Sequence, residues 1–342
     1  MAVNESTPLL SVRDLKTYYY SEEGVVKAVD GATFEVRPGR TVGIVGESGC
    51  GKSVTARSIL RIVERPGRIV NGEILWQRPD AQPAIDLAKL DADGKAMRGI
   101  RGAEISLIFQ EPMTSFSPVH SVGDQIAEAL LIHGRADRRE AREQVIDLLK
   151  RVGIPRPEQR VDSFPYQLSG GLRQRAMIAM ALACDPKLLI ADEPTTALDV
   201  TTQAQVLDLL RQLQEQNHMA VMLITHNLGV VAEMAEDVVV MYLGRVVEQG
   251  PVDAIFYDPK HPYTRALLRS IPSLDAPPRE KLPTIPGTIP HPNNRPNGCP
   301  FHPRCASFVR GLCDKEEPPT TEVALGHRVS CFLYRGPEEA AR

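Results

Sequence analysis

The stretch from Thr41 to Ala56, TVGIVGESGCGKSVTA, decides the fold of this 342-residue chain. It opens with an apolar run, Val42 to Val45, of the kind that forms a buried strand. Gly46 to Ser53 then matches G-x-x-x-x-G-K-S/T at every fixed position. The residues from Ser53 to Leu60 are compatible with a helix. A strand, a glycine-rich turn and a helix in this order predict a loop that binds phosphate groups.

The chemistry of this loop is that of a nucleoside triphosphate site. Its successive backbone N–H groups form a nest for anions, and the helix N-terminus adds a partial positive charge. Gly46, Gly49 and Gly51 allow the backbone to approach phosphate oxygens closely. Lys52 can reach the β- and γ-phosphates, and the Ser53 hydroxyl can ligate Mg²⁺. We therefore predict that the chain binds a nucleoside triphosphate.

The composition describes a globular protein without a bias towards nucleic acid. The length allows about two domains, and 42% hydrophobic with 24% charged residues supports a full core. The 40 basic and 43 acidic residues give a net charge of −3, which creates no field that favours nucleic acid. No apolar run approaches the roughly 18 residues of a transmembrane helix, and residues 1–10 lack the pattern of a signal peptide. We expect a cytoplasmic location.

Two further apolar runs end in side chains that suit phosphate chemistry. Residues 186–193 read as a buried parallel strand that ends in Asp192 and Glu193 at the sheet edge where ligands bind. Such an acidic pair is structural more often than not. Beside a phosphate loop, Asp192 can hold Mg²⁺ through its water shell and Glu193 can polarise an attacking water. His226 follows the run 221–224, where it is either a satisfied core histidine or a contact for the γ-phosphate.

The N-terminal part of the chain predicts strands. Short β-type runs lie between residues 9 and 45. The tyrosines at 18–20 cannot all face one core, so at least one ring is exposed. That ring could stack on adenine, although core packing or a surface position is the simpler interpretation. Residues 71–101 are polar and read as an insertion, and 104–109 predicts a strand that ends at Gln110.

The section from about residue 111 to 183 is predicted to be mostly helical. Apolar residues between 145 and 152 fall on one face of a helix. Met113 and Phe116 are either core residues or exposed apolar side chains. The segment Ser169-Gly170-Gly171 precedes an apolar helix, where it is an N-cap, an anion-binding terminus or both.

These motifs, taken in order, resemble those of the ATP-binding cassette (ABC) ATPases. The resemblance rests on Gly46–Ser53, Gln110, Leu168–Gly171, Leu188–Glu193, Ala197–Asp199 and His226. It implies an α/β fold with an ABC-type P-loop NTPase core, an antiparallel β subdomain and a helical subdomain at about 111–182. The nucleotide-binding domain would span residues 1–255. Leu172 departs from the pattern, because many members carry glutamine there.

The resemblance also implies a site and a mechanism. ATP would be bound by the loop, a stacking tyrosine and the glutamine, namely Tyr19, Gly46, Ser48, Gly49, Cys50, Gly51, Lys52, Ser53, Val54 and Gln110. Mg²⁺ would be held through Ser53, Gln110 and Asp192, and hydrolysis would depend on Glu193 and His226. Two such chains would close head to tail on ATP, each presenting Ser169, Gly170 and Gly171 to the other's nucleotide. Loss of the γ-phosphate would weaken this closure.

The character of the sequence changes after Gly250, because 12 of the 28 prolines fall within residues 251–300. Proline at this density forbids a continuous helix or a central strand, so we expect a separate appendage over 256–342. The run His261–Leu268, followed by Ile271–Pro272, resembles the C-terminal extension of oligopeptide/dipeptide importer ATPases. This likeness implies a peripheral protein on the cytoplasmic face of the inner membrane. It also implies two permease subunits, a second, similar ATPase chain as heterodimer partner and, indirectly, a substrate-binding protein.

Four of the six cysteines lie in this extension, at Cys299, Cys305, Cys313 and Cys331. In a reducing compartment, such thiols are metal ligands more often than disulfides. Structural Zn²⁺ usually has ligand pairs about two to four residues apart, which this spacing lacks, although His302 could replace one cysteine. Iron–sulfur clusters tolerate wider spacing, and the resemblance implies a 4Fe–4S cluster. Zn²⁺ is the alternative, and four unrelated buried thiols are the third interpretation.

Chain length excludes several other functions. A chromosome or repair ATPase would need a long coiled coil between Gln110 and Ser169, where only 58 residues lie. A drug exporter would carry fused transmembrane helices, and a translation ATPase would carry two cassettes. The alternatives are an importer for nickel or another small solute, and a metal-cluster redox-sensing module with secondary ATPase activity.

Overall fold

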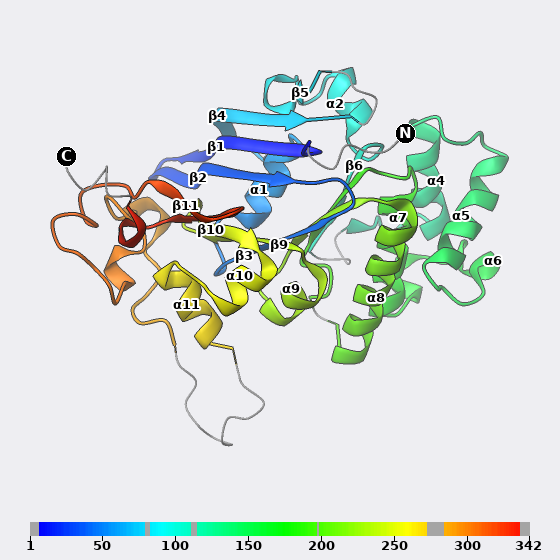
Figure 1. Ribbon diagram of the computed structural model, residues 1–342. Helices are drawn as coiled ribbons and strands as arrows, with labels where there is room; N and C mark the ends of the chain where they lie inside the picture. Colours follow the sequence, from blue (N-terminus) through cyan, green and yellow to red (C-terminus); the bar gives the residue numbers. More distant parts are fainter. Residues whose placement is uncertain (1–6, 79–82, 111–114, 197, 272–283, 336–342) are drawn as a thin grey trace. The chain divides into compact units, whose positions relative to one another are not determined.

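The computed structural model describes residues 7–78, 83–110, 115–196, 198–271 and 284–335 (Figure 1). The chain divides into two compact units that alternate along the sequence. The first holds residues 1–8, 36–41 and 89–224, and the second holds 9–35, 42–88 and 225–342. The predicted boundary at residue 255, between a nucleotide-binding domain and an extension, does not coincide with a boundary between these two units. It stays a prediction. Across the described ranges, no helix has the length and apolar character needed to cross a membrane.

The first unit contains a parallel sheet in the order β6 (Ile105–Ile108), β7 (Leu188–Asp192) and β8 (Ala220–Ile224). Ile105 of β6 lies opposite Leu188 of β7, which in turn lies opposite Ala220 of β8. Every residue of β7 and β8 is buried, as expected for parallel strands that are covered on both faces. The strands predicted from the apolar runs are therefore confirmed.

Helices make up much of the rest of the first unit. They are α2 (Lys95–Ile100), α4 (Val122–Ile132), α5 (Glu140–Arg151), α6 (Pro157–Arg160), α7 (Gly170–Leu182) and α8 (Val200–Asn217), with a 3₁₀ turn η2 (Pro165–Gln167). α4, α5 and α7 contact one another, and α5 buries Val145, Leu148 and Leu149 on one face. The predicted helical section is confirmed over the described residues. Met113 lies outside them, and Phe116 is 4% exposed, which makes it a core residue.

The strands of the second unit form two sheets (Figure 1). One has the order β2 (Gly24–Val36), β1 (Leu10–Ser21), β4 (Gly67–Trp76) and β5 (Ile85–Asp86), and β4 runs antiparallel to β1 and β5. The other has the order β11 (Thr320–Ala324), β12 (His327–Ser330), β10 (Arg245–Pro251), β9 (Asp237–Tyr242) and β3 (Thr41–Val45). The expected β subdomain is confirmed. The insertion predicted at 71–101 is wrong in part, because β4 continues to the fully buried Trp76.

Helices and turns of the second unit connect these strands. The helices are α1 (Lys52–Ile59), α9 (Leu228–Met234), α10 (Val252–Tyr257) and α11 (Pro262–Arg269), and the 3₁₀ turns are η1 (Leu87–Lys89), η3 (Pro292–Asn294), η4 (His302–Arg304) and η5 (Phe332–Tyr334). α10 packs against β9, β10 and α9.

The C-terminal extension, which we expect to be a separate appendage, contributes two strands to the second of these sheets. β12 pairs with β10, with Val329 opposite Glu248. The rings of Tyr242, Tyr263 and Phe301 form a buried cluster, with centroids 4.7 to 5.3 Å apart. The prolines do limit regular structure between 251 and 300, but the two paired strands lie beyond that stretch.

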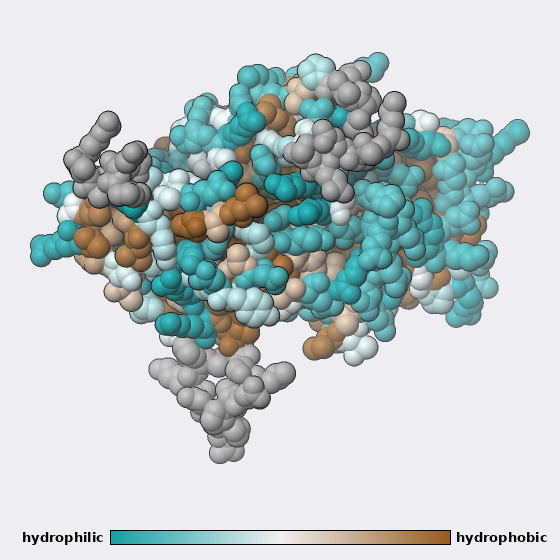
Figure 2. Space-filling model, viewed as in Figure 1, coloured by the Kyte–Doolittle hydropathy of each residue, from teal (hydrophilic) through white to brown (hydrophobic). Residues whose placement is uncertain are grey.

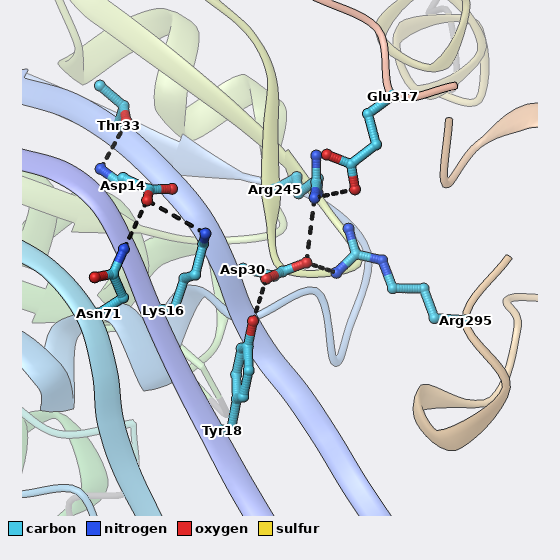
Figure 3. Close-up of polar contacts among 9 residues, drawn as sticks. All are labelled: Asp14, Lys16, Tyr18, Asp30, Thr33, Asn71, Arg245, Arg295 and Glu317. Atoms are coloured by element: carbon cyan, nitrogen blue, oxygen red, sulfur yellow. Dashed lines mark hydrogen bonds and ion pairs between the residues drawn. The ribbon is translucent and has the colours of Figure 1, made fainter. Parts of the chain in front are cut away.

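A cluster of charges around the buried Asp30 also connects the extension to β2 (Figure 3). Asp30 accepts hydrogen bonds from the hydroxyl of Tyr18, from Arg295 at 2.6 Å and from Arg245 at 3.3 Å. Arg245 also pairs with Glu317. Burial alone would raise the pKa of Asp30, but the bond from Tyr18 and the two arginines outweigh it and hold the pKa below its usual value.

The surface seen in Figure 2 is mostly hydrophilic, and its apolar side chains lie in small separate groups. Among the exposed apolar residues, Leu325 and Tyr257 belong to the extension. The face in view therefore shows no single large apolar area among the described residues.

Candidate nucleotide-binding site

The loop after β3 has the backbone that phosphate binding requires. Gly46 and Gly51 have φ values of 148° and 104°, which residues with a Cβ rarely adopt. A Cβ at Gly46 would collide with the carbonyl oxygen of Met241, and one at Gly51 with that of Ala28. α1 starts at Lys52, directly after the loop. The predicted strand, turn and helix are confirmed as local structure.

Lys52 is held against this loop. The residue is 6% exposed, and its Nζ donates to the carbonyl oxygens of Gly46 at 2.8 Å and of Glu47 at 3.3 Å. Cys50 Sγ lies 3.8 Å from the same nitrogen, and burial raises the pKa of this thiol. The ammonium therefore has a defined position beside the loop N–H groups, as an anion-binding turn requires.

In the first unit, β7 ends at Asp192, and Glu193 follows directly after the strand. Asp192 is 6% exposed. Glu193 has a φ of 49°, a left-handed conformation that costs roughly 1–2 kcal/mol for a residue with a side chain and is concentrated at functional sites. Its N–H donates to the carbonyl oxygen of Ile224 at 2.8 Å, which connects the strained residue to β8.

Two donors orient the carboxylate of Glu193. Gln110 Nε2 donates to Oε2 at 3.0 Å, and Thr196 Oγ1 donates to the same oxygen at 2.9 Å. The structure therefore brings together Gln110 and Glu193, which the sequence placed in one site. Sequence reasoning missed Thr196. Its signal is a hydroxyl three residues after the acid, a spacing from which a threonine can bond back to a neighbour in the chain.

His226 belongs to the second unit and is exposed. Thr225 N–H donates to the carbonyl oxygen of Ile44 at 3.3 Å, so this segment runs beside β3, the strand that leads into the phosphate loop. Asn227 caps α9 by accepting the N–H groups of Gly229 and Val230. The exposure of His226 argues against the interpretation as a core histidine. Its contact with a γ-phosphate stays a prediction.

The segment from Ser169 to Gly171 lies at the start of a helix. Ser169 is the N-cap of α7, and its hydroxyl accepts the N–H of Leu172 at 3.4 Å. Ser169 and Gly170 are exposed. The N-cap interpretation is confirmed. Anion binding by this helix N-terminus stays a prediction.

The three adjacent tyrosines have different surroundings. Tyr18 is bonded to Asp30, and Tyr20 lies under the guanidinium of Arg68, 4.3 Å from its ring centroid. Tyr19 is partly buried beside Gly67, where a Cβ would crowd its ring, and burial raises its pKa. The stacking of Tyr19 on adenine, which the resemblance implies, stays a prediction.

The four cysteines of the extension line one cavity of about 70 Å³, together with His261 and His302. All six cysteines of the chain are described and carry free thiols. Burial raises the pKa of Cys299, Cys305 and Cys331, and the backbone N–H groups two residues further on, those of Phe301, Ser307 and Leu333, oppose this rise.

Burial raises the pKa of Cys299 and Cys331 to about 11, with the neighbouring cysteines adding to the effect and these N–H groups opposing it. Among the described residues, no group of three or more side chains has the arrangement of a metal site. The cavity therefore gathers the predicted ligands, but it does not by itself support a 4Fe–4S cluster or another metal.

The predicted site residues divide between the two units. Tyr19, the phosphate loop and His226 belong to the second, and Gln110, the segment Ser169–Gly171, Asp192 and Glu193 belong to the first. The second unit carries a phosphate loop after a strand, and the first carries an oriented carboxylate after a strand. Both features are typical of P-loop ATPases.

Comparisons with known proteins agree with this class. The family described as "ABC transporter" matches residues 29–196, and the family "Oligopeptide/dipeptide transporter, C-terminal region" matches residues 247–313. The chain is similar to the dimeric structure of the ATP-binding cassette MJ0796 bound to ADP and Pi, with a TM-score of 0.62 and 26% identity over 71% of this chain and 98% of that one.

Similar curated proteins cover almost the whole chain. A probable peptide ABC transporter ATP-binding protein of Sinorhizobium fredii is 50% identical over 95% of this chain and 94% of its own length. The dipeptide transport ATP-binding protein DppD of Escherichia coli is 47% identical, covering 94% and 96%. The oligopeptide transport ATP-binding protein AppD of Bacillus subtilis is 47% identical, covering 97% and 98%. The chain belongs to the ATP-binding subunits of ABC transporters, in the oligopeptide/dipeptide transporter family, and is an ABC-type ATPase.

Proposed function

We propose that this ATPase energises the import of di- and oligopeptides across the inner membrane. The observation that carries the proposal is the 47–50% identity to peptide-transport subunits over nearly the whole chain, extension included. The match of residues 247–313 to the C-terminal region of oligopeptide/dipeptide transporters supports the same substrate class. Peptide is favoured over nickel or another small solute for this reason.

In this proposal, the second unit binds ATP. Tyr19 stacks on adenine, and the loop holds the phosphates through its N–H groups and the Lys52 ammonium. The other proposed contacts are Gly46, Ser48, Gly49, Cys50, Gly51, Ser53 and Val54. The buried position of Lys52 against its own loop supports this assignment, because little side-chain entropy is lost when the phosphates arrive.

Hydrolysis is proposed to depend on Glu193 and His226. Glu193 polarises the attacking water, and Gln110 and Thr196 hold its carboxylate in a fixed orientation, which makes it a preorganised group. His226 contacts the γ-phosphate. Ser53, Gln110 and Asp192 are the proposed Mg²⁺ ligands, and the ion neutralises charge on the phosphate oxygens. The products are ADP and phosphate.

The proposed partners follow from the family. A second, similar ATPase chain would complete each site with its Ser169–Gly171 terminus, whose exposure in this chain is consistent with that role. Two permease subunits would hold the pair at the cytoplasmic face of the membrane, and the substrate-binding protein would act through them.

A 4Fe–4S cluster held by Cys299, Cys305, Cys313 and Cys331 is also proposed, with Zn²⁺ as the alternative. The four cysteines line one cavity, which brings the four thiols to one place in the extension. A bound cluster would supply a cross-link and part of the folding free energy of the extension.

Uptake by whole cells tests the substrate class. In a strain that lacks this gene, uptake of a labelled dipeptide and pentapeptide should fall, and the wild-type gene should restore it. The Lys52→Ala variant, expressed at the same level, should not. Normal peptide uptake with lost nickel uptake would overturn the peptide assignment and leave the ATPase assignment intact.

A further inference from the structure

The second residue of the phosphate loop, Glu47, is held by two residues of the C-terminal extension. Arg304 of η4 forms a bidentate pair with its carboxylate, Nη1 to Oε2 at 2.7 Å and Nη2 to Oε1 at 3.0 Å. Tyr263 of α11 accepts the Glu47 N–H on its hydroxyl at 2.9 Å. These residues lie 257 and 216 positions away in the chain. Both the side chain and the backbone of Glu47 are therefore fixed by the extension.

The contacts are shielded from water. The Arg304 side chain is 4% exposed, that of Glu47 is 21% exposed, and Tyr263 is fully buried. Arg304 also donates to the carbonyl oxygen of Pro286 at 3.0 Å and to the Tyr242 hydroxyl at 3.3 Å. A bidentate arginine pair of this kind fixes geometry as well as charge. Removal of one partner leaves the other charge buried without compensation.

This arrangement reaches the phosphate-binding groups through Lys52. The carbonyl oxygens of Gly46 and Glu47 accept hydrogen bonds from its Nζ. If Glu47 rotated, one of these carbonyls would move and the ammonium would lose its position. The carboxylate of Glu47 is also a negative charge within a loop that binds a polyanion. Arg304 neutralises this charge at the point where it would repel phosphate.

We propose that Arg304 and Tyr263 are positioning residues for the phosphate loop, through which the extension sets the affinity for ATP. The inference rests on the proposed role of the loop in ATP binding. Arg304 acts mainly by cancelling the charge of Glu47, and Tyr263 acts by fixing the peptide that precedes Ser48. Neither residue contacts the nucleotide in this scheme.

The test uses the purified full-length chain and measures the Kd for Mg·ATP together with kcat and KM. Arg304→Gln should raise Kd and KM roughly ten-fold or more, with a smaller change in kcat. This defect should shrink at high ionic strength, because salt screens the partly exposed Glu47 charge. Adding Glu47→Gln to Arg304→Gln should restore most of the affinity, because the unneutralised charge is gone. Arg304→Lys should give an intermediate value.

Matched controls separate positioning from general stability. Arg335→Gln removes another arginine pair of the extension, with Glu316, and should leave Kd unchanged. Tyr263→Phe should raise Kd about two- to ten-fold, whereas Tyr334→Phe, which removes the hydroxyl bonds to Arg265 and Lys260 in the same extension, should not.

Wild-type affinity in a folded Arg304→Gln chain, or no rescue by Glu47→Gln, would overturn the inference. If Arg304→Gln does not fold, an unchanged Kd in Tyr263→Phe overturns it instead. A wild-type chain that binds no ATP would contradict the proposed function itself.

Discussion

Glu193 shows at the scale of one residue how position and chemistry combine. Its backbone is left-handed, its N–H is bonded to β8, and its carboxylate is oriented by Gln110 and Thr196. Strain of this kind persists only where neighbouring contacts over-determine the conformation. Glu193 combines a strained backbone with a carboxylate that accepts two hydrogen bonds. This combination favours a functional role for Glu193 over a purely structural one.

Glu193→Gln should abolish ATP turnover while ATP binding is kept. Glutamine preserves the size of the side chain but cannot polarise water as a carboxylate does, so kcat should fall about 100-fold or more. In the presence of ATP and its partner subunit, the variant should accumulate as a closed dimer. Single-turnover hydrolysis and gel filtration measure both effects, with the surface variant Glu322→Gln as control. Near-parental hydrolysis in the assembled transporter would show that the assignment is wrong.

Thr196→Val should lower kcat with little change in ATP affinity. Valine keeps the shape but removes the hydrogen bond to Glu193 Oε2, and the loss of one such bond to a charged group corresponds to roughly ten-fold. Steady-state kinetics at saturating ATP measure it. Thr196→Ser, which keeps the hydroxyl, is the matched control, and equal losses in both variants would contradict the orienting role.

At the scale of elements, the extension is stabilised by aromatic side chains that pack against Tyr242 of β9. Tyr242 comes from β9, Tyr263 from α11 and Phe301 from the residue before η4, and each is at most 1% exposed. Aromatic pairs of this geometry stabilise beyond the area that they bury. The extension is thereby joined to the sheet through side chains as well as through β12.

Phe301→Ala should lower the free energy of unfolding by about 3–5 kcal/mol, the range for removal of a buried aromatic ring. Phe308→Ala is the matched control, since Phe308 is 41% exposed in the same extension and should change stability by less than about 1 kcal/mol. Urea denaturation of both variants gives the comparison. Equal stability losses would mean that the aromatic cluster does not anchor the extension.

His261 should make the stability of the extension depend on pH. It is buried and caps α11 by accepting the N–H of Tyr263, and burial lowers its pKa to about 3. Because the unfolded histidine titrates near 6.5, the unfolded state binds the extra proton. The contribution of His261 is therefore fully present above about pH 6.5 and is lost as pH falls towards 3, by about 1.4 kcal/mol per pH unit.

Denaturation curves between pH 7 and pH 4 test this dependence against His261→Asn. Asparagine can keep the cap but does not titrate, so the variant should show a shallower loss of stability with acid. If the free energy of unfolding falls equally steeply with acid in His261→Asn and in the wild type, other groups account for the pH dependence.

At the scale of the whole molecule, the cysteine cavity lies in the same extension that holds the phosphate loop. Anaerobically purified chain should be brown, with visible charge-transfer absorption and near-equal iron and acid-labile sulfide. Cys313→Ser should lose this absorption, whereas Cys184→Ser, a buried cysteine outside the extension, should keep it. Colourless protein with stoichiometric zinc would exclude a 4Fe–4S cluster but leave the four cysteines as the metal ligands.

ATP turnover that is lost in Glu193→Gln but unaffected in Cys299→Ser would count against a redox-sensing module.

The sequence by itself determined the parts that depend on local chain geometry. The phosphate loop follows from glycines at fixed spacing, and the buried strands follow from continuous apolar runs, since both are set by contacts between near neighbours. Only the tertiary structure decided how distant residues meet. It paired β12 of the extension with β10, brought Gln110 to the carboxylate of Glu193, and placed Arg304 on Glu47. These contacts join segments whose spacing has no periodic pattern, so they depend on how the chain packs rather than on any single stretch of it.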